Sequence, residues 1–470
     1  MTTPPSAAEG APVSKSYRAW VLLLLMLIYL SNFVDRIIIS VLGEAIKLDL
    51  KITDGQMGLL AGLAFAGSYG LMCIPIARLA ERFRRTTIIA VAITVWSAFT
   101  ALCGMAGNFT QLLLFRIGVG AGEAGYAPAA QSLISDYYPP EKRASAMAVF
   151  ALGVPLGTLF GALAGGYIAQ HIDWRAAFLI VGLPGLILAI VVRLFLKEPR
   201  RGQSDPMPAA QAAQAPPLTA VIRTLASSPA FLLMTAGLAL VSLTSFGLTQ
   251  FMAPFFIRVF GFDYTQAGMA LGLLGGVSAA LGTFLGGWLT DRTAAKSRSW
   301  YALIGGLGAL AAIPFYLFGF QQQSAAMALV VLFLGPIGLF CGQAPVYAFT
   351  HNLVAPRMRA SSTALVIVAL TIIGAGLGPL LTGAVMDLVN GQLFHSRFGG
   401  DFLLACPGGR GATVNLAEAC RITLAEGARY SLMVIVSLLV LPGGLFLLAS
   451  RYVERDLALA AARNASKGDA

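Results

Sequence analysis

The sequence contains few charged residues. Asp, Glu, Lys and Arg make up 11% of the 470 residues, whereas 57% of the residues are hydrophobic. Because a soluble domain typically carries about 25% charged residues, this composition excludes a water-soluble globular protein. The glycines and prolines are dispersed through apolar runs, as is typical of transmembrane helices. The composition therefore predicts a polytopic helical membrane protein.

Cysteine and histidine are also scarce, with five and three residues respectively. Their spacing fits no metal site, so we expect neither a metal nor another cofactor. Cys73, Cys103 and Cys341 fall in apolar runs and are expected to be inert core thiols. Cys406 and Cys420 fall in one long segment outside the apolar runs, where we predict a disulfide if that segment faces an oxidising compartment.

Acidic residues are fewer than basic ones, 21 against 32, and the net charge is +11. A positive charge can indicate nucleic-acid binding. Here, however, the basic residues lie mostly in short clusters between apolar runs, as in the cytoplasmic loops of membrane proteins. We therefore expect no nucleic-acid partner.

The apolar runs predict about twelve transmembrane helices, because each fills a window of about twenty residues. They are too long and too continuous for the alternating strands of an outer-membrane barrel. The predicted spans are 19–42, 56–80, 87–106, 109–137, 145–170, 174–196, 228–257, 266–290, 300–319, 325–353, 361–388 and 428–451.

Most Lys and Arg residues fall between spans on the side of the N-terminus. The positive-inside rule therefore places both termini in the cytoplasm. The first apolar run has no small-residue cleavage site, so we expect a retained span and not a removed signal peptide. These features predict an integral protein of a plasma membrane, such as a bacterial inner membrane.

A Pro-, Ala- and Gln-rich stretch, 197–219, separates the sixth span from the seventh and has no helical periodicity of its own. It is typical of a linker between two halves. The predicted organisation is a cytoplasmic tail at 1–18, a six-helix bundle at 19–196, a linker at 197–227, a second six-helix bundle at 228–452 with an outer loop at 390–426, and a cytoplasmic tail at 453–470.

An internal repeat supports two related halves. The tripeptide RAS at 143–145 recurs at 359–361, and LAER at 79–82 recurs as LTDR at 289–292. Glycine-rich fifth and eleventh spans correspond as well. Three similarities in the same order favour two parallel halves related by an axis along the membrane normal.

These motifs resemble those of the major facilitator superfamily. ARLAERFRR at 77–85 resembles its loop signature between helices 2 and 3, with Ala77 in place of the usual Gly and Glu81 in place of Asp. Gly287, Asp291 and Arg292 resemble the second copy of that signature. Within the superfamily, NFVDR at 32–36 and the run from Arg116 to Arg143 resemble the spinster-type branch, although related anion-transporting branches share these features.

The resemblance implies an all-α membrane protein in which two pseudo-symmetric six-helix bundles form the major facilitator fold. It also implies alternating access around a central cavity lined by helices 1, 4, 7 and 10. The spinster-type resemblance implies an amphiphilic lipid cargo, such as a lysophospholipid or a sphingolipid, with protons as the coupling ion. We expect a monomer surrounded by membrane lipids.

Four ionisable residues fall inside the predicted spans: Asp35, Arg36, Arg116 and Glu123. Because a charge in hydrocarbon is costly, each needs a partner or a function. At 1.5 Å per residue, Asp35 lies about 22 Å and Arg116 about 20 Å from the cytoplasmic side, so the two are level. Glu123 lies about two turns beyond Arg116 on the same face.

One interpretation of this cluster is purely structural: Asp35 and Arg116 form a buried ion pair that holds helices 1 and 4 together. The other is functional. Arg116 would bind Asp35 or a substrate anion in turn, while Glu123, together with Asp35, couples transport to protons. Arg36 is as readily structural as functional.

The second half does not repeat these charges, because positions 216 residues later hold Phe251, Leu332 and Leu339. This asymmetry favours a cavity with one charged and one apolar wall, suited to an amphiphile. Alternatively, each Phe is ordinary core or lipid-facing packing. The predicted substrate-binding residues are Arg116, Asn32, Tyr126, Phe251, Gln250, Gln343 and Tyr347.

Charged residues at the cytoplasmic helix ends predict a conformational latch between the halves. Alternatively, they only set the topology. The latch residues are Glu81, Arg82, Arg85, Asp291 and Arg292.

The sequence therefore predicts a proton-coupled secondary transporter for an amphiphile, and not an enzyme. It contains no nucleotide-binding motif, so the driving force is expected to be a gradient of ions or substrate. The alternatives are a small organic-anion/proton symporter, a multidrug efflux transporter, and a membrane receptor or scaffold without transport activity.

Overall fold

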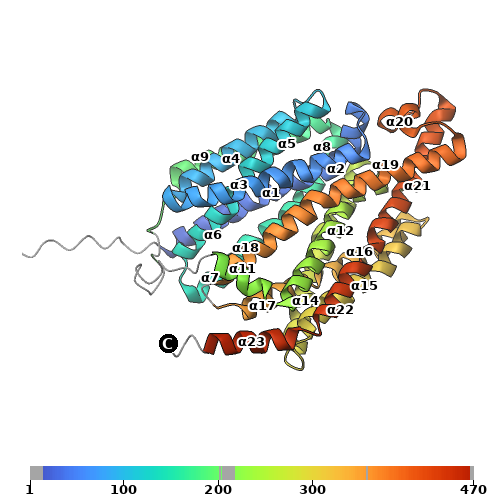
Figure 1. Cartoon of the computed structure of the whole chain (residues 1–470). Coiled ribbons are helices and arrows are strands. Elements are labelled where there is room, and N and C mark those ends of the chain that lie inside the picture. Colours follow the sequence, from blue (N-terminus) through green and yellow to red (C-terminus); the bar gives the residue numbers. More distant parts are fainter. Residues whose placement is uncertain (1–13, 201–202, 204–217, 356–357, 466–470) are drawn as a thin grey trace, which may run out of the picture.

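The computed structural model describes residues 14–200, 203, 218–355 and 358–465, and within these ranges the chain is helical with no strand. Figure 1 shows long helices that run roughly side by side. The first half contains α1 (Lys15–Leu50), α2 (Asp54–Ala61), α3 (Leu63–Arg82), α4 (Arg85–Cys103), α5 (Phe109–Glu123), α6 (Tyr126–Tyr137), α7 (Pro140–Ala151), α8 (Gly153–His171) and α9 (Trp174–Phe195).

The second half begins with a short helix and adds π-helical segments, η1 and η3, to two of its long helices. Its elements are α11 (Leu218–Ala226), α12 (Pro229–Phe260), α13 (Tyr264–Leu271), η1 (Gly272–Ser278), α14 (Ala279–Thr293), α15 (Trp300–Gln321), α16 (Ala325–Phe340), α17 (Gln343–Leu353), α18 (Arg359–Ala369), η3 (Leu370–Leu377), α19 (Gly378–Phe398), α20 (Phe402–Ala405), η4 (Pro407–Gly409), α21 (Val414–Ser437), α22 (Val440–Ala449) and α23 (Val453–Ala465).

Eleven helical stretches in the described part of the chain are long and apolar enough to cross a membrane. The twelfth expected span, 109–137, consists of α5 and α6, which are separated by a turn at Ala124 and Gly125. The second half contains a matching break at Cys341 and Gly342, between α16 and α17. The sequence repeat is therefore accompanied by a structural one: each half interrupts its fourth span near the same depth.

The two halves have separate hydrophobic cores. One core is built from residues 21–196, and the other is built mainly from residues 221–460. In the first half α1 packs against α8 and α4 against α9, whereas in the second α12 and α15 both pack against α22. We call the two halves the N-bundle and the C-bundle.

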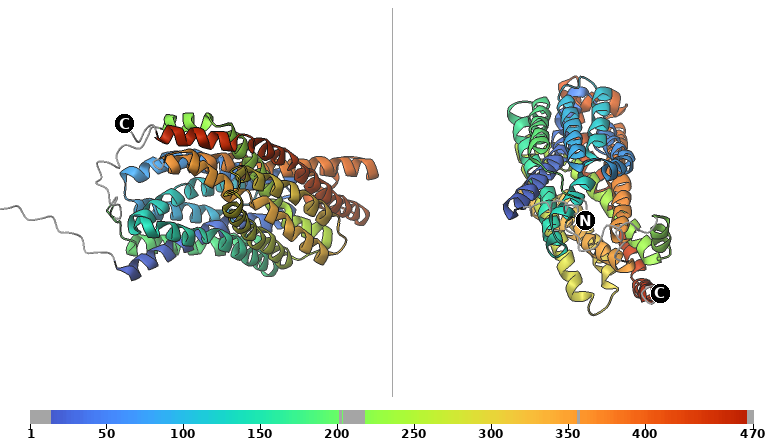
Figure 2. Two further views of the ribbon diagram at one scale, coloured as in Figure 1. Left: turned by 90° about the horizontal axis from the view of Figure 1, so that it is seen from below. Right: turned by 90° about the vertical axis from the view of Figure 1, so that its left-hand side faces the viewer.

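Both ends of the described chain lie at one end of the molecule. Figure 2 shows the start of α1 and the end of α23 at the same end, opposite α20. We call the end that carries Lys15 and Ala465 the terminal face and the opposite end the distal face. Between the bundles, α1 contacts α12, α8 contacts α13 and η1, α3 contacts η3, and α2 contacts α19.

Three segments expected as linker, tail or loop contain helices. Part of the predicted linker lies outside the described residues, but 218–226 forms α11, whose Val221 and Leu225 are buried one turn apart. The predicted tail forms α23, and its buried Asp456 accepts hydrogen bonds from Ser228 and from the backbone N–H of Ala230. These bonds satisfy the N-terminus of α12 and fix α23 to the C-bundle. The predicted outer loop includes α20, the end of α19 and the start of α21.

Candidate functional site

Two helices of the N-bundle bring the four intramembrane charges together. The 36-residue helix α1 carries Asp35 and Arg36 near its middle, and α5 carries Arg116 and ends at Glu123. Asp35, Arg116 and Glu123 are buried, whereas 28% of the Arg36 side chain is exposed. Glu123 immediately precedes the turn between α5 and α6, so it lies where the backbone of the fourth span is interrupted.

Arg36 is the partner of Glu123. Its Nε donates to Glu123 Oε2 at 2.7 Å, and its guanidinium lies about 5 Å from the ring centres of Phe33, Phe65 and Tyr69. Three aromatic faces and one carboxylate therefore hold this cation. The sequence left the role of Arg36 open, and the structure gives it a charge partner on the facing helix.

Arg116 lies behind this pair. Its Nε donates a long hydrogen bond of 3.4 Å to the Leu60 carbonyl, and its guanidinium packs 5.2 Å from the centre of the Phe65 ring. Within the described ranges it forms no ion pair, and neither carboxylate oxygen of Asp35 accepts a hydrogen bond. The structure therefore does not contain the direct Asp35–Arg116 pair that equal depth suggested.

Two residues of α4 complete the surroundings of Asp35. The Trp96 indole and the Thr100 hydroxyl lie near its carboxylate but outside hydrogen-bonding geometry, and both are fully buried. Asn32, one turn before Asp35, is also buried and has an unpaired side-chain nitrogen. Sequence reasoning missed Trp96 and Thr100, although polar side chains one turn apart in an apolar helix were an available signal.

Tyr126 packs inside the N-bundle and hydrogen-bonds to its backbone. It is fully buried at the start of α6, its hydroxyl donates to the Leu25 carbonyl, and its ring lies among Tyr29, Trp96 and Phe150. The hydroxyl is thus already engaged by the backbone of α1.

The predicted residues of the C-bundle fall in two places. Gln250 is buried where the bundles meet, and its Oε1 accepts from Ser40 at 2.8 Å, whereas Phe251 is part of the C-bundle core. Gln343 and Tyr347 lie one turn apart at the start of α17 and are half-buried. Tyr347 lies within electrostatic range of Tyr29 of α1.

A second buried charge cluster joins the bundles at the distal face. Arg258 at the end of α12 binds Glu44 Oε2 at 2.7 Å and Asp54 Oδ1 at 2.6 Å, and Lys47 binds Asp54 Oδ2 at 2.8 Å. Asp387 of α19 accepts from the backbone N–H groups of Asp54 and Gly55 at 3.0 and 2.8 Å. We call Glu44, Lys47, Asp54, Arg258 and Asp387 the distal cluster.

Close backbone packing accompanies the distal cluster. A Cβ on Gly58 of α2 would lie 2.2 Å from the Pro379 carbonyl oxygen, and one on Gly383 would lie 2.2 Å from the Asp54 carbonyl oxygen. Only glycine permits this approach without a shift. The distal ends of α1, α2, α12 and α19 are therefore closed against one another.

The five residues predicted to form a latch do not lie together in one cluster. Arg85 is buried and binds Asp136 of α6 and Glu198, which follows α9. Arg82, Asp291 and Arg292 are exposed, and Arg292 lies 4.0 Å from the centre of the Trp288 ring. The side chain of Glu81 lies outside the described structure.

Glu198 follows α9 at the terminal face. Burial alone would raise its pKa, but hydrogen bonds from the Thr86 backbone N–H and from Arg85 leave the pKa of Glu198 below its ordinary value. The carboxylate therefore stabilises the start of α4 while it is ionised.

Cys406 and Cys420 form a disulfide, with their Cα atoms 5.8 Å apart. The bonded segment belongs to the C-bundle but rests on the N-bundle, because a Cβ on Gly408 would lie 3.0 Å from the Lys51 Cα atom. It therefore covers the distal end of α1, next to Lys47.

Comparisons with known proteins fit this arrangement. The family model described as Major Facilitator Superfamily matches residues 22–390. An MFS-type efflux pump of Mycolicibacterium smegmatis is 32% identical over 394 residues, covering 82% of this chain and 89% of that protein. Protein spinster homolog 1 of Xenopus tropicalis is 25% identical over 464 residues, covering 94% of this chain and 82% of that protein.

A solved structure is similar over almost the whole chain. It is the crystal structure of a bacterial homologue of the human lysosomal transporter Spinster in an inward-facing and unoccupied conformation. It is 34% identical and has a TM-score of 0.87, covering 94% of this chain and 99% of that one. The chain therefore belongs to the major facilitator superfamily and is a homologue of its spinster-type transporters.

Proposed function

We propose that this protein is a proton-coupled secondary transporter for an amphiphile with an anionic head, such as a lysophospholipid or a sphingolipid-like molecule. The observation that carries the proposal is the pair between Arg36 and Glu123. Its cation is 28% exposed, whereas the side chain of its carboxylate is completely buried. One member can therefore meet a substrate while the other is shielded from it.

The pair couples an anion to a proton. While Glu123 is ionised, its Oε2 occupies Arg36, and a substrate anion must compete for the same guanidinium. When Glu123 takes up a proton, its attraction for Arg36 weakens and the guanidinium can bind the anionic head. Proton and anion then favour each other's binding, so both cross together.

Asp35 and Arg116 supply the second step of this exchange. Arg116 has no carboxylate partner among the described residues, and Asp35 has no hydrogen-bonded partner, although each is costly to leave unpaired. We assign to Asp35 the role of a second proton-binding carboxylate, positioned by Trp96 and Thr100. Arg116 compensates the negative charge when Asp35 or Glu123 is ionised.

The apolar chain of the substrate would lie toward the C-bundle. The positions equivalent to the charged residues hold Phe251, Leu332 and Leu339, which pack in the C-bundle core and leave the side of the site toward that bundle without charges at these positions. We assign Gln343 and Tyr347 of α17, which are both half-buried, to hydrogen bonds with a polar linkage in the head. One charged and one apolar wall are complementary to an amphiphile.

We propose alternating access, in which the distal cluster closes one side of the protein. Its closure implies that substrate exchanges at the terminal face, which we assign to the cytoplasm of a bacterial cell on the basis of the basic loops. Rocking of the bundles would separate the distal cluster and bring Glu81, Arg82, Asp291 and Arg292 together as a latch, with Arg85 fixing its N-bundle side. We propose that the monomer is the transporting unit.

The test is flux of a labelled lysophospholipid into proteoliposomes under an imposed pH gradient. Flux driven by the pH gradient is expected with wild type and not with Glu123→Gln. The variant should still bind the lipid. Equal dependence on the gradient in both proteins would contradict the coupling.

A second candidate is efflux of small hydrophobic molecules, favoured by the similarity to an efflux pump. The same vesicles distinguish the two, because displacement by cationic dyes and not by lysolipid would support efflux. Displacement by small dicarboxylates would instead support organic-anion transport.

A further inference from the structure

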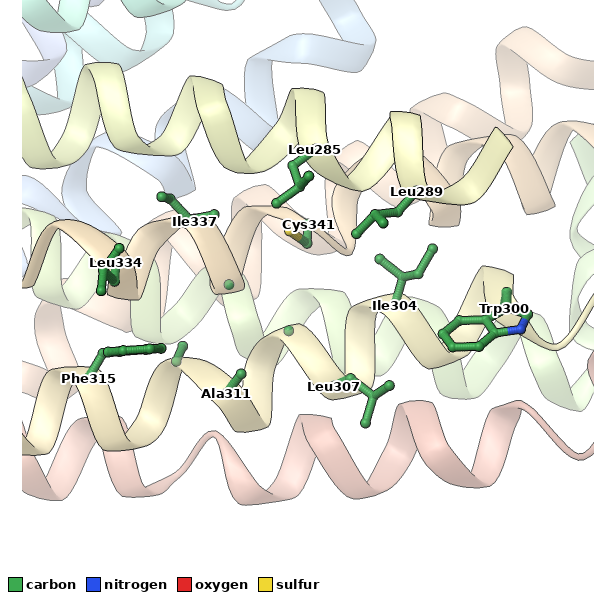
Figure 3. Close-up of a pocket in the computed structure, with 13 residues that line it drawn as sticks. Leu285, Leu289, Trp300, Ile304, Leu307, Ala311, Phe315, Leu334, Ile337 and Cys341 are labelled. Carbon is green, nitrogen blue, oxygen red and sulfur yellow. The ribbon is translucent and has the colours of Figure 1, made fainter. Parts of the chain in front are cut away.

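An apolar groove lies on the C-bundle, away from the charged cluster. It has a volume of about 370 Å³ and is formed by α14, α15 and α16. Figure 3 shows Leu285 and Leu289 on one wall, Trp300 to Phe315 on the other, and Leu334 and Ile337 on the helix between them. Every lining residue is apolar, cysteine or glycine apart from the indole nitrogen of Trp300.

Small residues make the groove deep. A Cβ on Gly308 of α15 would lie 2.5 Å from the Gly338 carbonyl oxygen of α16, so the two backbones touch. Ala311, one turn after Gly308, is exposed on the same wall. The larger side chains on either side therefore stand above a floor of glycine and alanine.

The groove opens to the membrane. Leu285, Leu307, Phe315 and Leu334 are 37%, 48%, 38% and 41% exposed, and all four lie on helical stretches that can cross a bilayer. Trp300 and Phe315 are fifteen residues apart on α15, which corresponds to about 22 Å along the helix. One leaflet measures about 20–22 Å when its headgroup layer is included, so the groove spans the leaflet at the terminal face.

Basic residues lie at the terminal end of the groove. Trp288 is 42% exposed, and with Trp300 it marks the level of the lipid headgroups. The end of α14 carries Arg292, and the segment between α14 and α15 carries Lys296 and Arg298, all exposed, against the single acid Asp291 of α14. Glu454 of α23 also approaches this segment, where it accepts from Ser297. The mouth of the groove keeps a net positive charge.

We propose that the groove binds one acyl chain of an anionic phospholipid from the bilayer, with the lipid phosphate at Arg292, Lys296 and Arg298. The groove itself contains none of the residues proposed for transport, whereas Arg292 at its mouth also belongs to the proposed latch. The site holds α14, α15 and α16 together at a place where their own side chains leave a gap.

The experiment counts phosphatidylglycerol and phosphatidylcholine molecules retained by the purified full-length protein in native mass spectrometry. Wild type is expected to retain phosphatidylglycerol in preference to phosphatidylcholine. Ala311→Phe fills the groove from an exposed position and should weaken retention about tenfold, because several methylene contacts are lost. Val330→Phe is the matched control, since Val330 is 64% exposed on α16 but does not line the groove.

The double variant Lys296→Gln/Arg298→Gln tests the headgroup contacts without altering the groove. It should weaken retention of phosphatidylglycerol about tenfold and leave phosphatidylcholine unchanged. Equal retention by Ala311→Phe and Val330→Phe would overturn the chain site. Equal retention of the two lipids by wild type would overturn the headgroup assignment.

Discussion

Replacement of Arg258 by Ala should open the distal face. Arg258 is the cation that α12 of the C-bundle contributes to the distal cluster, where it binds Glu44 and Asp54 of the N-bundle at 2.7 and 2.6 Å. The three side chains are 4%, 6% and 1% exposed, so water does not screen the pairs. After Arg258→Ala, Asp54 retains Lys47, but Glu44 stays buried without the arginine.

The structure gives the size of the effect. Removing one partner of a buried ion pair costs about 3–5 kcal/mol, because the remaining charge is uncompensated. The cost falls on the closed distal face alone, since opening returns Glu44 to water. A tenfold change in population corresponds to about 1.4 kcal/mol, so the ratio of closed to open should fall by about a hundredfold to a few thousandfold. A wild type that is 99% closed would become mostly open, as an order of magnitude.

Electron spin resonance can measure this shift. Labels on cysteines at Thr110 and Gln323 report the distance between bundles at the distal face, because both positions are exposed there. Cys73, which is half-buried, is replaced by Ser to remove a competing thiol.

The matched control is Arg175→Ala. Arg175 pairs with Asp49 within the N-bundle, and the two side chains are 34% and 45% exposed. Exposed pairs contribute about 0–1 kcal/mol, so this variant should keep the short distance. Unchanged distances in Arg258→Ala, or the same lengthening in Arg175→Ala, would refute the reasoning.

Four further outcomes are expected. Gly58→Val should also lengthen the distance between the labels at the distal face, because its Cβ would lie 2.2 Å from the Pro379 carbonyl oxygen. Gly391→Ala should leave that distance unchanged, because a Cβ on Gly391 would have no atom within 4 Å. Equal effects of the two variants would contradict close packing as the cause. Tyr126→Phe should lower the free energy of unfolding by about 1 kcal/mol through its lost hydrogen bond, with lysolipid affinity unchanged, and a weaker affinity at unchanged stability would give Tyr126 a binding role. Cys406→Ser should lower stability by about 3 kcal/mol, as for a bridge that closes a loop of this length, measured by thermal unfolding with and without reductant; a reductant effect of the same size in the variant would argue against the bridge. Because the folded-state pKa of Glu198 is depressed, its stabilisation is present above the unfolded pKa of about 4.3 and is lost as the pH falls through the folded value. Glu198→Gln should therefore reduce the fall in melting temperature at acidic pH. The same fall in wild type and variant would contradict this.

Much of the fold could be predicted from hydrophobicity. The long apolar runs predicted the spans. The structure adds a turn near the middle of the fourth span and of the tenth span, and each turn contains a glycine. The intramembrane charges predicted that α1 and α5 would meet, and Glu123 does reach α1.

The choice of partner could not be predicted. Neighbouring residues on a helix point about 100° apart, so the rotation of α1 decides whether Asp35 or Arg36 faces α5. That rotation depends on the packing of α1 against α8 and the other helices. The spacing of the charges in the sequence does not determine it. The depth of each charged residue in the membrane could be predicted from the sequence, but the direction of its side chain could not.

The distal cluster was missed for a different reason. Lys47 and Arg258 lie beyond the apolar windows and therefore resemble loop charges in the sequence. In the structure α1 has 36 residues and α12 has 32, longer than the roughly 20 residues that a bilayer requires, so both helices carry these charges past the apolar windows and into one cluster. Residues 54 and 387 are far apart in sequence, and only the packing of α2 on α19 joins them.

The central claim is that one buried carboxylate couples proton and substrate, and proton movement during downhill substrate flux tests it most directly. Proteoliposomes without a pH gradient are loaded with a pH-sensitive dye, and a labelled lysophospholipid is added outside. Lipid entry should acidify the lumen with wild type, because Glu123 carries a proton inward with each anion, and should leave the pH unchanged with Glu123→Gln. Lipid entry with no pH change in wild type, or equal acidification in both proteins, would contradict the account.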